Sequence, residues 1–144
     1  MATIILYYSQ TGNTEHIATR IHENLGCDLL KIEPDSNEGG FMKLPSGFRT
    51  EIPDLSQYDI VFVGYPVWAH DVPPFVQKFI ANCNLTGKIV IPFSTYAMGG
   101  FENTVQTMQK ICTGAEVKNP FGSGKMSKGN YEDWIKAVRN LVDN

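Results

Sequence analysis

The chain has 144 residues and a formal net charge of −3, with 42% hydrophobic and 19% charged residues. This length and balance predict a single soluble globular domain over residues 1–144. No apolar run approaches the roughly 20 residues that cross a bilayer, and the net negative charge argues against nucleic acid as the main partner. We therefore expect neither a membrane nor nucleic acid among its partners.

The cysteines indicate a reducing environment. Cys27, Cys83 and Cys112 are odd in number and widely spaced, and the chain contains no C-x-x-C pair. This pattern predicts neither a disulfide framework nor a metal site. The first predicted strand begins directly at the N-terminus, with no basic region or cleavage site before it. We expect a cytoplasmic protein with reduced thiols.

The first part of the chain predicts a strand, a polar turn and a helix. Residues 3–8 (TIILYY) are typical of a strand buried on both faces. Residues 14–25 carry apolar side chains at helical spacing, and Gly26 follows as a C-cap. Between them, residues 9–14 (SQTGNT) form an uncharged loop rich in hydroxyl and amide groups.

This loop has the donors that a phosphate needs. The first N–H groups of a helix have no partner within the helix, and the helix dipole is positive there. Gly12 permits a close backbone approach, and the loop contains no Lys or Arg. It therefore predicts a phosphate site built from neutral donors. The alternative is that Asn13 or Thr14 only caps the helix. The loop matches neither a Walker motif nor a dinucleotide fingerprint.

The next segments predict further strands and one more helix. Residues 28–33 (DLLKIE) read as a strand with Leu29, Leu30 and Ile32 inward. Residues 34–57 read as an irregular connection with a short helical turn near residues 41–44. A strand over residues 59–65 (DIVFVGY) leads to a loop over residues 66–72. Pro73 and Pro74 then suit the first turn of a helix that runs to about residue 82.

The C-terminal half repeats this alternation. Residues 88–94 (KIVIPFS) predict a strand, residues 95–101 (TYAMGGF) a glycine-bearing loop and residues 102–112 a helix. Residues 115–117 predict a short fifth strand, and residues 119–129 read as a mobile or draped segment. Asn130 is the expected N-cap of the last helix. Alternating strands and helices predict a parallel sheet covered by helices on both faces.

Three loops leave the carboxyl ends of predicted strands, at residues 9–14, 66–72 and 95–101. Ligands of such sheets bind at that edge, so we expect the three loops to converge. Trp68 and Tyr96 would hold a flat ring between them, next to the phosphate loop. The alternative is that each aromatic packs on a neighbouring loop. A phosphorylated, flat, polar-edged heterocycle describes FMN.

The segments YYSQTGNTEHIA, YDIVFVGYPVWAHDVPPFVQKFI and GKIVIPFSTYAMGG resemble the flavodoxin family, and especially short-chain flavodoxin-like proteins. The resemblance extends over nearly the whole chain. It implies an α/β, three-layer flavodoxin-like fold, with helices on both faces of a five-stranded parallel sheet of order 2-1-3-4-5. The chain is too short for the loop that long-chain flavodoxins insert in their last strand.

The resemblance also implies which residues bind FMN. Residues 9–14 would hold the ribityl phosphate, and the other two loops would flank the isoalloxazine. The predicted cofactor-binding residues are Ser9, Gln10, Thr11, Gly12, Asn13, Thr14, Pro66, Val67, Trp68, Ala69, His70, Ser94, Thr95, Tyr96, Ala97, Gly99 and Gly100. Many flavodoxins place a small-residue–acid turn after the tryptophan, whereas this chain has Ala69, His70 and Asp71 there.

Three functions fit this sequence. The first is an electron carrier that docks to redox partner proteins, a reductase and an acceptor, as a monomer or weak dimer. The second is an FMN-dependent NAD(P)H oxidoreductase for quinones or nitro compounds, with His70 as a candidate proton donor. The third is a flavin-free phosphate-binding module of the same fold. Asp71 and Glu102 are the acids nearest the expected rim, which predicts a less extreme reduction potential than an acidic rim would give.

Overall fold

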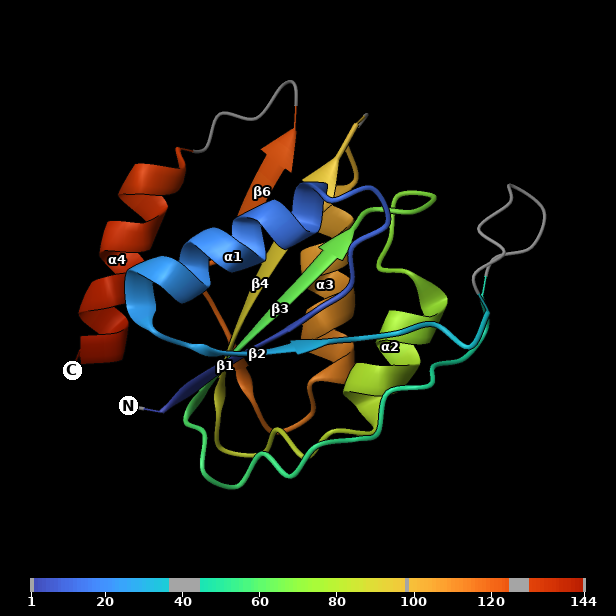
Figure 1. Ribbon diagram of the computed structural model, residues 1–144, viewed down its shortest axis with the longest axis horizontal. Coiled ribbons are helices and arrows are strands. Elements are labelled where there is room, and N and C mark those ends of the chain that lie inside the picture. The colour runs from blue at the N-terminus through green and yellow to red at the C-terminus, as the bar shows by residue number, and fades with distance from the viewer. Residues whose placement is uncertain (1, 37–44, 98, 125–129, 144) are drawn as a thin grey trace.

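The computed structural model describes residues 2–36, 45–97, 99–124 and 130–143. Its centre is a parallel sheet with the strand order β2-β1-β3-β4-β5, and a sixth strand, β6, also pairs with β4 (Figure 1). The elements are β1 (Thr3–Tyr7), α1 (Asn13–Leu25), β2 (Asp28–Lys31), β3 (Ile60–Pro66), α2 (Pro74–Ala81), β4 (Ile89–Tyr96), α3 (Phe101–Ile111), β5 (Glu116–Val117), β6 (Phe121–Gly124) and α4 (Tyr131–Asp143). The expected strand order is confirmed, but there are six strands rather than five.

The sixth strand arises because the fifth is interrupted. Val90 of β4 pairs with Val117, and Phe93 pairs with Phe121, so β4 advances three residues where its neighbour advances four. Asn119 takes up the extra length with a φ of 51°, and Trp134 Nε1 donates to its carbonyl at 2.6 Å. The prediction that residues 119–129 are mobile or draped is therefore wrong for residues 121–124. Residues 125–129 lie outside the described chain.

Each face of the sheet carries its own core. On one face, α1 and α4 pack on side chains such as Ile5, Phe62 and Phe93. On the other face, α2 and α3 pack on side chains such as Val61 and Val63. The expected apolar stripe of the second helix is confirmed, because Phe75, Val76, Phe79 and Ile80 are all fully buried. The three-layer arrangement of helix, sheet and helix follows from these two cores.

The second strand differs from its prediction. Leu29 is 39% exposed, although it was expected to face inward, whereas Ile32 is fully buried. The reason is that β2 lies at the edge of the sheet, where one face of the strand extends past the helices that cover the centre. The helical turn expected near residues 41–44 lies outside the described residues.

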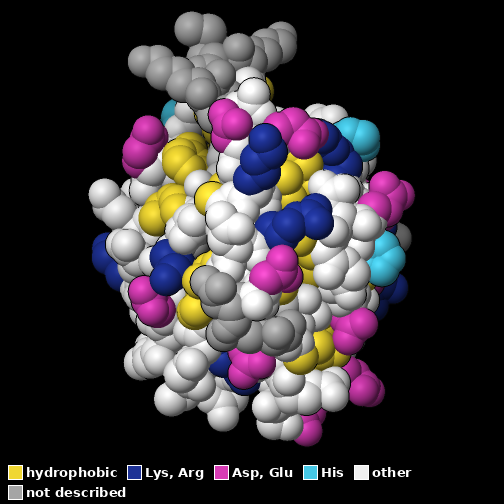
Figure 2. Space-filling model, turned by 90° about the vertical axis from the view of Figure 1, so that its left-hand side faces the viewer, with side chains coloured by type: hydrophobic (Ala, Val, Ile, Leu, Met, Phe, Trp, Pro, Cys, Tyr) yellow, Lys and Arg dark blue, Asp and Glu magenta, His cyan; other side chains and the backbone are white. Residues whose placement is uncertain are grey.

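Two predicted helix caps are confirmed. Gly26 adopts a left-handed conformation, with φ 72°, and its N–H bonds to His22 O after α1. Asn130 Oδ1 accepts the N–H of Glu132 at 2.8 Å in the first turn of α4. Charged side chains of both signs are interspersed over the face that carries α4 (Figure 2). Among the helices in the described ranges, none has the length and apolar character required to cross a membrane.

Candidate functional site

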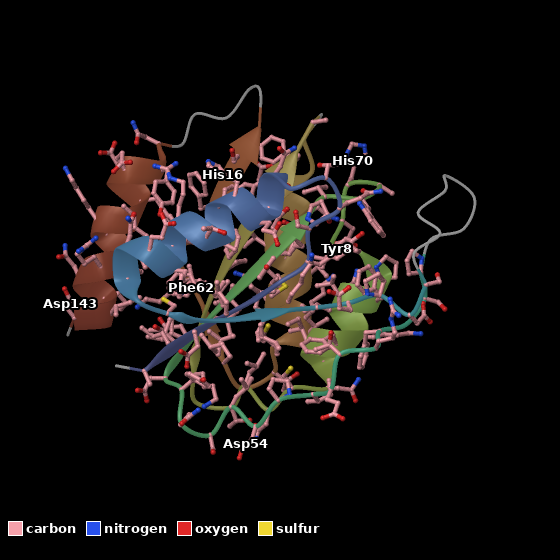
Figure 3. The ribbon with its side chains drawn as sticks, in the orientation of Figure 1. Tyr8, His16, Asp54, Phe62, His70 and Asp143 are labelled. Atoms are coloured by element: carbon pink, nitrogen blue, oxygen red, sulfur yellow. The ribbon has the colours of Figure 1, made fainter. Side chains whose placement is uncertain are left out.

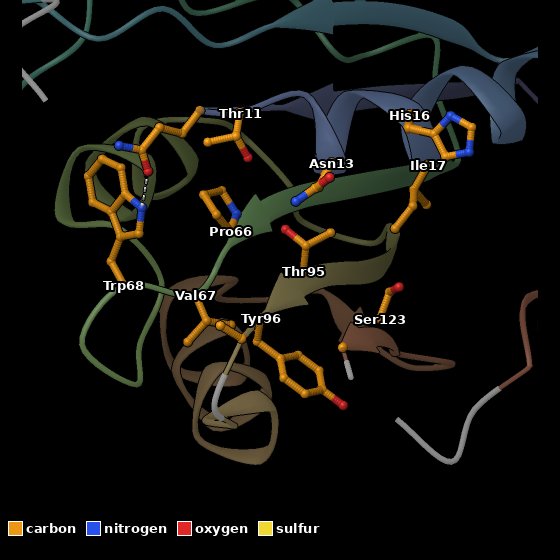
Figure 4. Close-up of a pocket in the computed structure, with 13 residues that line it drawn as sticks. Thr11, Asn13, His16, Ile17, Pro66, Val67, Trp68, Thr95, Tyr96 and Ser123 are labelled. Carbon is orange, nitrogen blue, oxygen red and sulfur yellow. Dashed lines mark hydrogen bonds between the residues drawn. The ribbon is translucent and has the colours of Figure 1, made fainter. Parts of the chain in front are cut away.

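A pocket of about 500 Å³ opens where the three predicted loops meet, at the carboxyl ends of β1, β3 and β4 (Figure 4). Figure 3 places His16 and His70 at this end of the sheet and Asp54 at the opposite end. Because the carboxyl ends of parallel strands share one edge, the expected convergence of the loops is confirmed. The lining residues are Gln10, Thr11, Asn13, His16, Ile17, Pro66, Val67, Trp68, Thr95, Tyr96, Ala97, Ser123 and Gly124.

The first loop leaves backbone donors free at the start of α1. Ser9 Oγ accepts the N–H groups of Gly12 and Glu15, each at 3.1 Å. Gly12 is the N-cap with φ 96° and has no side chain to cap the helix, so Ser9 from the preceding loop accepts the N–H of Glu15 instead. The alternative that Asn13 or Thr14 caps α1 is therefore wrong. Within the described chain, the N–H groups of these two residues have no partner, so they remain available to an acceptor in the pocket.

Thr14 connects the first loop to the end of β4. Its side chain is almost fully buried, and its Oγ1 lies 2.8 Å from Thr95 Oγ1. Thr95 and Tyr96 belong to β4 rather than to a loop, because they pair with Pro66 and Gly124. The third loop was thus predicted to begin two residues too early. The hydroxyl pair fixes the start of α1 against β4, directly under the pocket.

The second loop contains a tight two-residue turn. Trp68 and Asp71 exchange two backbone hydrogen bonds of 2.9 Å each. Between them, Ala69 and His70 have φ values of 49° and 64°, which is the left-handed pair that a type I′ turn requires. Neither residue is glycine, and a left-handed residue with a side chain costs roughly 1–2 kcal/mol. The turn that carries Trp68 is therefore strained.

Helix α3 holds this turn in place. Asn103 Nδ2 donates to His70 O at 2.8 Å, and Thr107 Oγ1 donates to Asp71 Oδ1 at 2.6 Å. Gly100, which precedes α3, has φ 93°, and a Cβ added there would lie 2.8 Å from His70 Cα. The second and third loops can approach this closely only because residue 100 has no side chain.

The two aromatic residues line the pocket from different segments, Trp68 from the turn after β3 and Tyr96 from the end of β4. Trp68 packs edge-on against Tyr8 with ring centroids 5.5 Å apart, and its Nε1 donates to Gln10 Oε1 at 3.1 Å (Figure 4). Tyr96 lies over Gly124 of β6, where an added Cβ would collide with its ring. Both rings are thus positioned by neighbouring residues, as the alternative reading expected, and both also face the pocket.

Several predicted site residues do not line the pocket. Ser94 is fully buried, and its Oγ has no hydrogen-bond partner in the described chain. The others act as supports of the loops or lie behind them: Ser9, Gly12, Thr14, Ala69, His70, Gly99 and Gly100. The expected acids, Asp71 and Glu102, do not line it either.

Four lining residues were not predicted. His16 and Ile17 lie three and four positions after Asn13, on the same side of α1, so helical spacing was a usable signal. Ser123 and Gly124 reach the pocket only because β6 pairs with the end of β4. No local pattern indicates that pairing, since FGSG reads as a loop.

Among the described residues that line the pocket, His16 is the one with an ionisable imidazole, and Asp, Glu, Lys and Arg are absent. Just behind the first loop, the Tyr7 hydroxyl donates to Glu15 Oε1 at 3.0 Å. Burial, together with this carboxylate, raises the pKa of Tyr7 to about 12. The described lining therefore offers neutral donors and aromatic surface to the pocket.

Comparisons with known proteins agree with this architecture. A flavodoxin from Haemophilus influenzae is 35% identical over 69 residues, which is 47% of this chain and 33% of that relative, so the match spans a third of the relative's length. A protein from Bacteroides uniformis has a TM-score of 0.76 at 20% identity, covering 99% of this chain and 98% of the other. A flavoprotein from Lactobacillus acidophilus, solved in complex with FMN, has a TM-score of 0.68 at 21% identity, covering 92% and 97%.

The structural likenesses show the fold, and the family match goes further. The model of the family described as flavodoxin matches residues 45–138, from the connection before β3 to the middle of α4. This range includes two of the three loops that form the pocket. Because the match extends over more than half of the sequence, the chain belongs to the flavodoxin family.

Proposed function

We propose that this chain binds FMN non-covalently and carries electrons between redox partner proteins. The observation that carries the proposal is the pocket itself, where neutral phosphate donors and two aromatic side chains face one cavity. Its volume of about 500 Å³ lies within the range usual for sites of small molecules and cofactors. The FMN-bound relative from Lactobacillus acidophilus supports the same ligand.

The phosphate end fits the first loop. The unpartnered N–H groups of Asn13 and Thr14 lie at the positive end of α1, where a phosphate is stabilised. Thr11 and Asn13 add side-chain donors that line the pocket. These four groups would hold the phosphate without a cation, as a neutral site requires.

The ring end fits the other two loops. Trp68 and Tyr96 offer aromatic surface, and Pro66, Val67 and Ala97 complete an apolar lining. The ligand has about 31 heavy atoms, so roughly −0.3 kcal/mol per atom gives binding near −9 kcal/mol. This corresponds to submicromolar affinity.

FMN supplies a ring that accepts and releases electrons singly or in pairs. The chain's residues bind and orient that ring and exclude water from it. A negative side chain at about 4 Å would oppose reduction by roughly 4 kcal/mol at an effective dielectric near 20, but the lining residues within the described ranges include none. We therefore expect a less extreme reduction potential than an acidic rim produces, which spectroelectrochemistry measures.

We also propose that residues 1–144 act as one flavodoxin-like domain in the cytoplasm, as a monomer or weak dimer. Two cores share one sheet, which supports a single unit. All three cysteines are free and buried, which supports a reducing compartment. The reductase alternative loses its suggested proton donor, since His70 does not line the pocket.

The decisive experiment is a flavin titration. Purified protein should show the visible spectrum of bound flavin, and apoprotein should quench the fluorescence of added FMN. Trp68→Leu should weaken binding by roughly tenfold, because stacking contributes about 1–3 kcal/mol. Phe48→Leu is the matched control, because Phe48 packs on Phe79 and neither residue lines the pocket.

Colourless protein that ignores added FMN would overturn the proposal and favour the flavin-free module. NAD(P)H added aerobically separates the remaining alternatives. A carrier keeps its flavin absorbance unless a partner reductase is present, whereas a reductase bleaches on its own.

A further inference from the structure

His16 is the one imidazole in the pocket lining. It lies in the first turn of α1, three residues after Asn13, so both side chains project from the same side of the helix. Figure 4 shows His16 at the end of the pocket opposite Trp68 and next to Ile17. This end also contains the free N–H groups at the start of α1, so the ring lies about one helical turn from the proposed phosphate position.

The charged residues near His16 along α1 are engaged by other groups. On α1, Glu15 is engaged by the Tyr7 hydroxyl at 3.0 Å and by Lys31 Nζ at 3.7 Å. Arg20 is bonded to Glu132 of α4 at 2.8 Å and lies over the Tyr131 ring at 3.8 Å. The facing strands contribute Ser123 from β6 and Tyr96 from β4. Among the lining residues that the structure describes, there is no carboxylate to compete for a protonated imidazole.

We propose that His16 is a proton-dependent contact for the phosphate of the bound flavin, an inference that rests on the proposed function. Protonated His16 adds a cation to a site whose other donors are neutral. An imidazole ordinarily gains its proton between about pH 6 and 7, and a phosphate monoester loses its second proton near pH 6. The cation and the dianion therefore coexist mainly around pH 6–7, where binding is strengthened most.

The size of the effect follows from exposure. A pair of unit charges about 4 Å apart gains roughly 1 kcal/mol in a fully aqueous environment, which is about fivefold in affinity. The His16 side chain is at the surface, so this aqueous figure applies better than the larger values of buried pairs. At pH 6.5, we expect wild-type protein to bind FMN about three- to tenfold more tightly than a variant without the imidazole.

The experiment compares wild type with His16→Gln from pH 5.5 to pH 8.5. Flavin fluorescence quenching gives the affinity for FMN and for riboflavin, which lacks the phosphate. The advantage of wild type should be largest near pH 6.5, should vanish by pH 8.5, and should be absent for riboflavin. His16→Lys keeps a cation at high pH, so it should bind FMN more tightly than wild type at pH 8.5.

His22→Gln is the control for the loss of a histidine. His22 lies at the other end of α1, where its Nδ1 contacts Cys27 O at 2.6 Å, and this variant should keep the pH profile of wild type. A second readout is spectroscopic: the imidazole resonances of His16 should change position when FMN is added at pH 6.5, and should not move with riboflavin.

The outcomes separate the two proposals. If FMN binds but His16→Gln and wild type have the same profile, His16 does not contact the phosphate. If the variant loses affinity for FMN and riboflavin equally, the effect is structural and the inference is also wrong. If neither ligand binds to wild type, the proposed function itself is overturned.

Discussion

Two adjacent glycines offer a controlled test of how the second and third loops meet. Gly99 and Gly100 have φ values of 106° and 93°, so alanine is strained at either position. A Cβ at residue 99 would have no heavy atom within 4 Å among the described residues other than its chain neighbours. At residue 100 it would lie 2.8 Å from His70 Cα and 3.0 Å from Val67 Cγ1. The two variants therefore share the backbone strain and differ in the collision.

The magnitudes follow from these two terms. The backbone strain of a left-handed alanine destabilises the folded state by roughly 1–2 kcal/mol. Replacing glycine by alanine also restricts the unfolded chain, which stabilises the protein by about 0.4–1 kcal/mol. Gly99→Ala should therefore lower the free energy of unfolding by about 1 kcal/mol. Gly100→Ala adds an overpacking penalty of roughly 1–3 kcal/mol, because the nearest atom belongs to the backbone of the strained turn.

Urea unfolding at fixed pH measures both variants, and FMN titration tests the consequence for the pocket. Gly100→Ala should displace the turn that carries Trp68 and weaken FMN binding by roughly tenfold, which is about 1.4 kcal/mol. Gly99→Ala should leave the affinity almost unchanged. Equal losses of stability and of affinity in the two variants would refute the claim that residue 100 sets the approach of the loops.

Three further predictions follow from single features. Ser94→Ala should raise the free energy of unfolding by about 1 kcal/mol in urea melts, because it removes a buried hydroxyl without a partner in the described chain; a loss of stability would contradict this. Ala69→Gly should stabilise the protein by about 0.5 kcal/mol in the same assay, since it relieves the left-handed strain of the turn; Ala81→Gly, at the end of α2, should instead destabilise. Burial raises the pKa values of Cys83 and Cys112 from 9.0 to about 12. Their contribution to stability is therefore complete below pH 9 and is lost as pH rises toward 12, which a series of urea midpoints measures; a flat series would contradict it.

The sequence indicated those parts of the fold in which burial is uniform. Strand β3 is apolar throughout because helices cover both of its faces, and α2 shows a clear stripe because one side meets the core. The edge strand β2 lacks that uniformity, and Leu29 was misplaced as a result. Local pattern predicts elements well where the packing environment is the same along their length.

Strand β6 could not be predicted, because its glycines are required by neighbours that are distant in sequence. A Cβ at Gly122 would lie 2.6 Å from the Phe101 ring, and one at Gly124 would collide with Tyr96. In sequence these glycines read as a flexible loop, whereas in the fold they admit two aromatic rings. The left-handed turn at residues 69 and 70 could not be predicted for a similar reason. Ala and His rarely occupy such turns, and side chains of α3 stabilise the conformation from outside the turn.

The sequence predicted which three loops form the site. Their convergence followed from strand order, but the roles within them did not. Thr14 was expected to bind phosphate, yet its hydroxyl meets Thr95, and Ser9 satisfies backbone donors of the loop. Which hydroxyl faces a ligand and which supports the loop depends on backbone geometry that spacing alone does not specify.

The interruption between β5 and β6 also affects whether copies of this protein can associate through the edges of their sheets. The outer margin of the sheet is divided into runs of two and four residues, and Pro120 between them has no N–H to offer a foreign strand. A neighbouring molecule would find no continuous row of amides and carbonyls to extend. The interruption between β5 and β6 therefore protects this edge of the sheet against fibrous self-association.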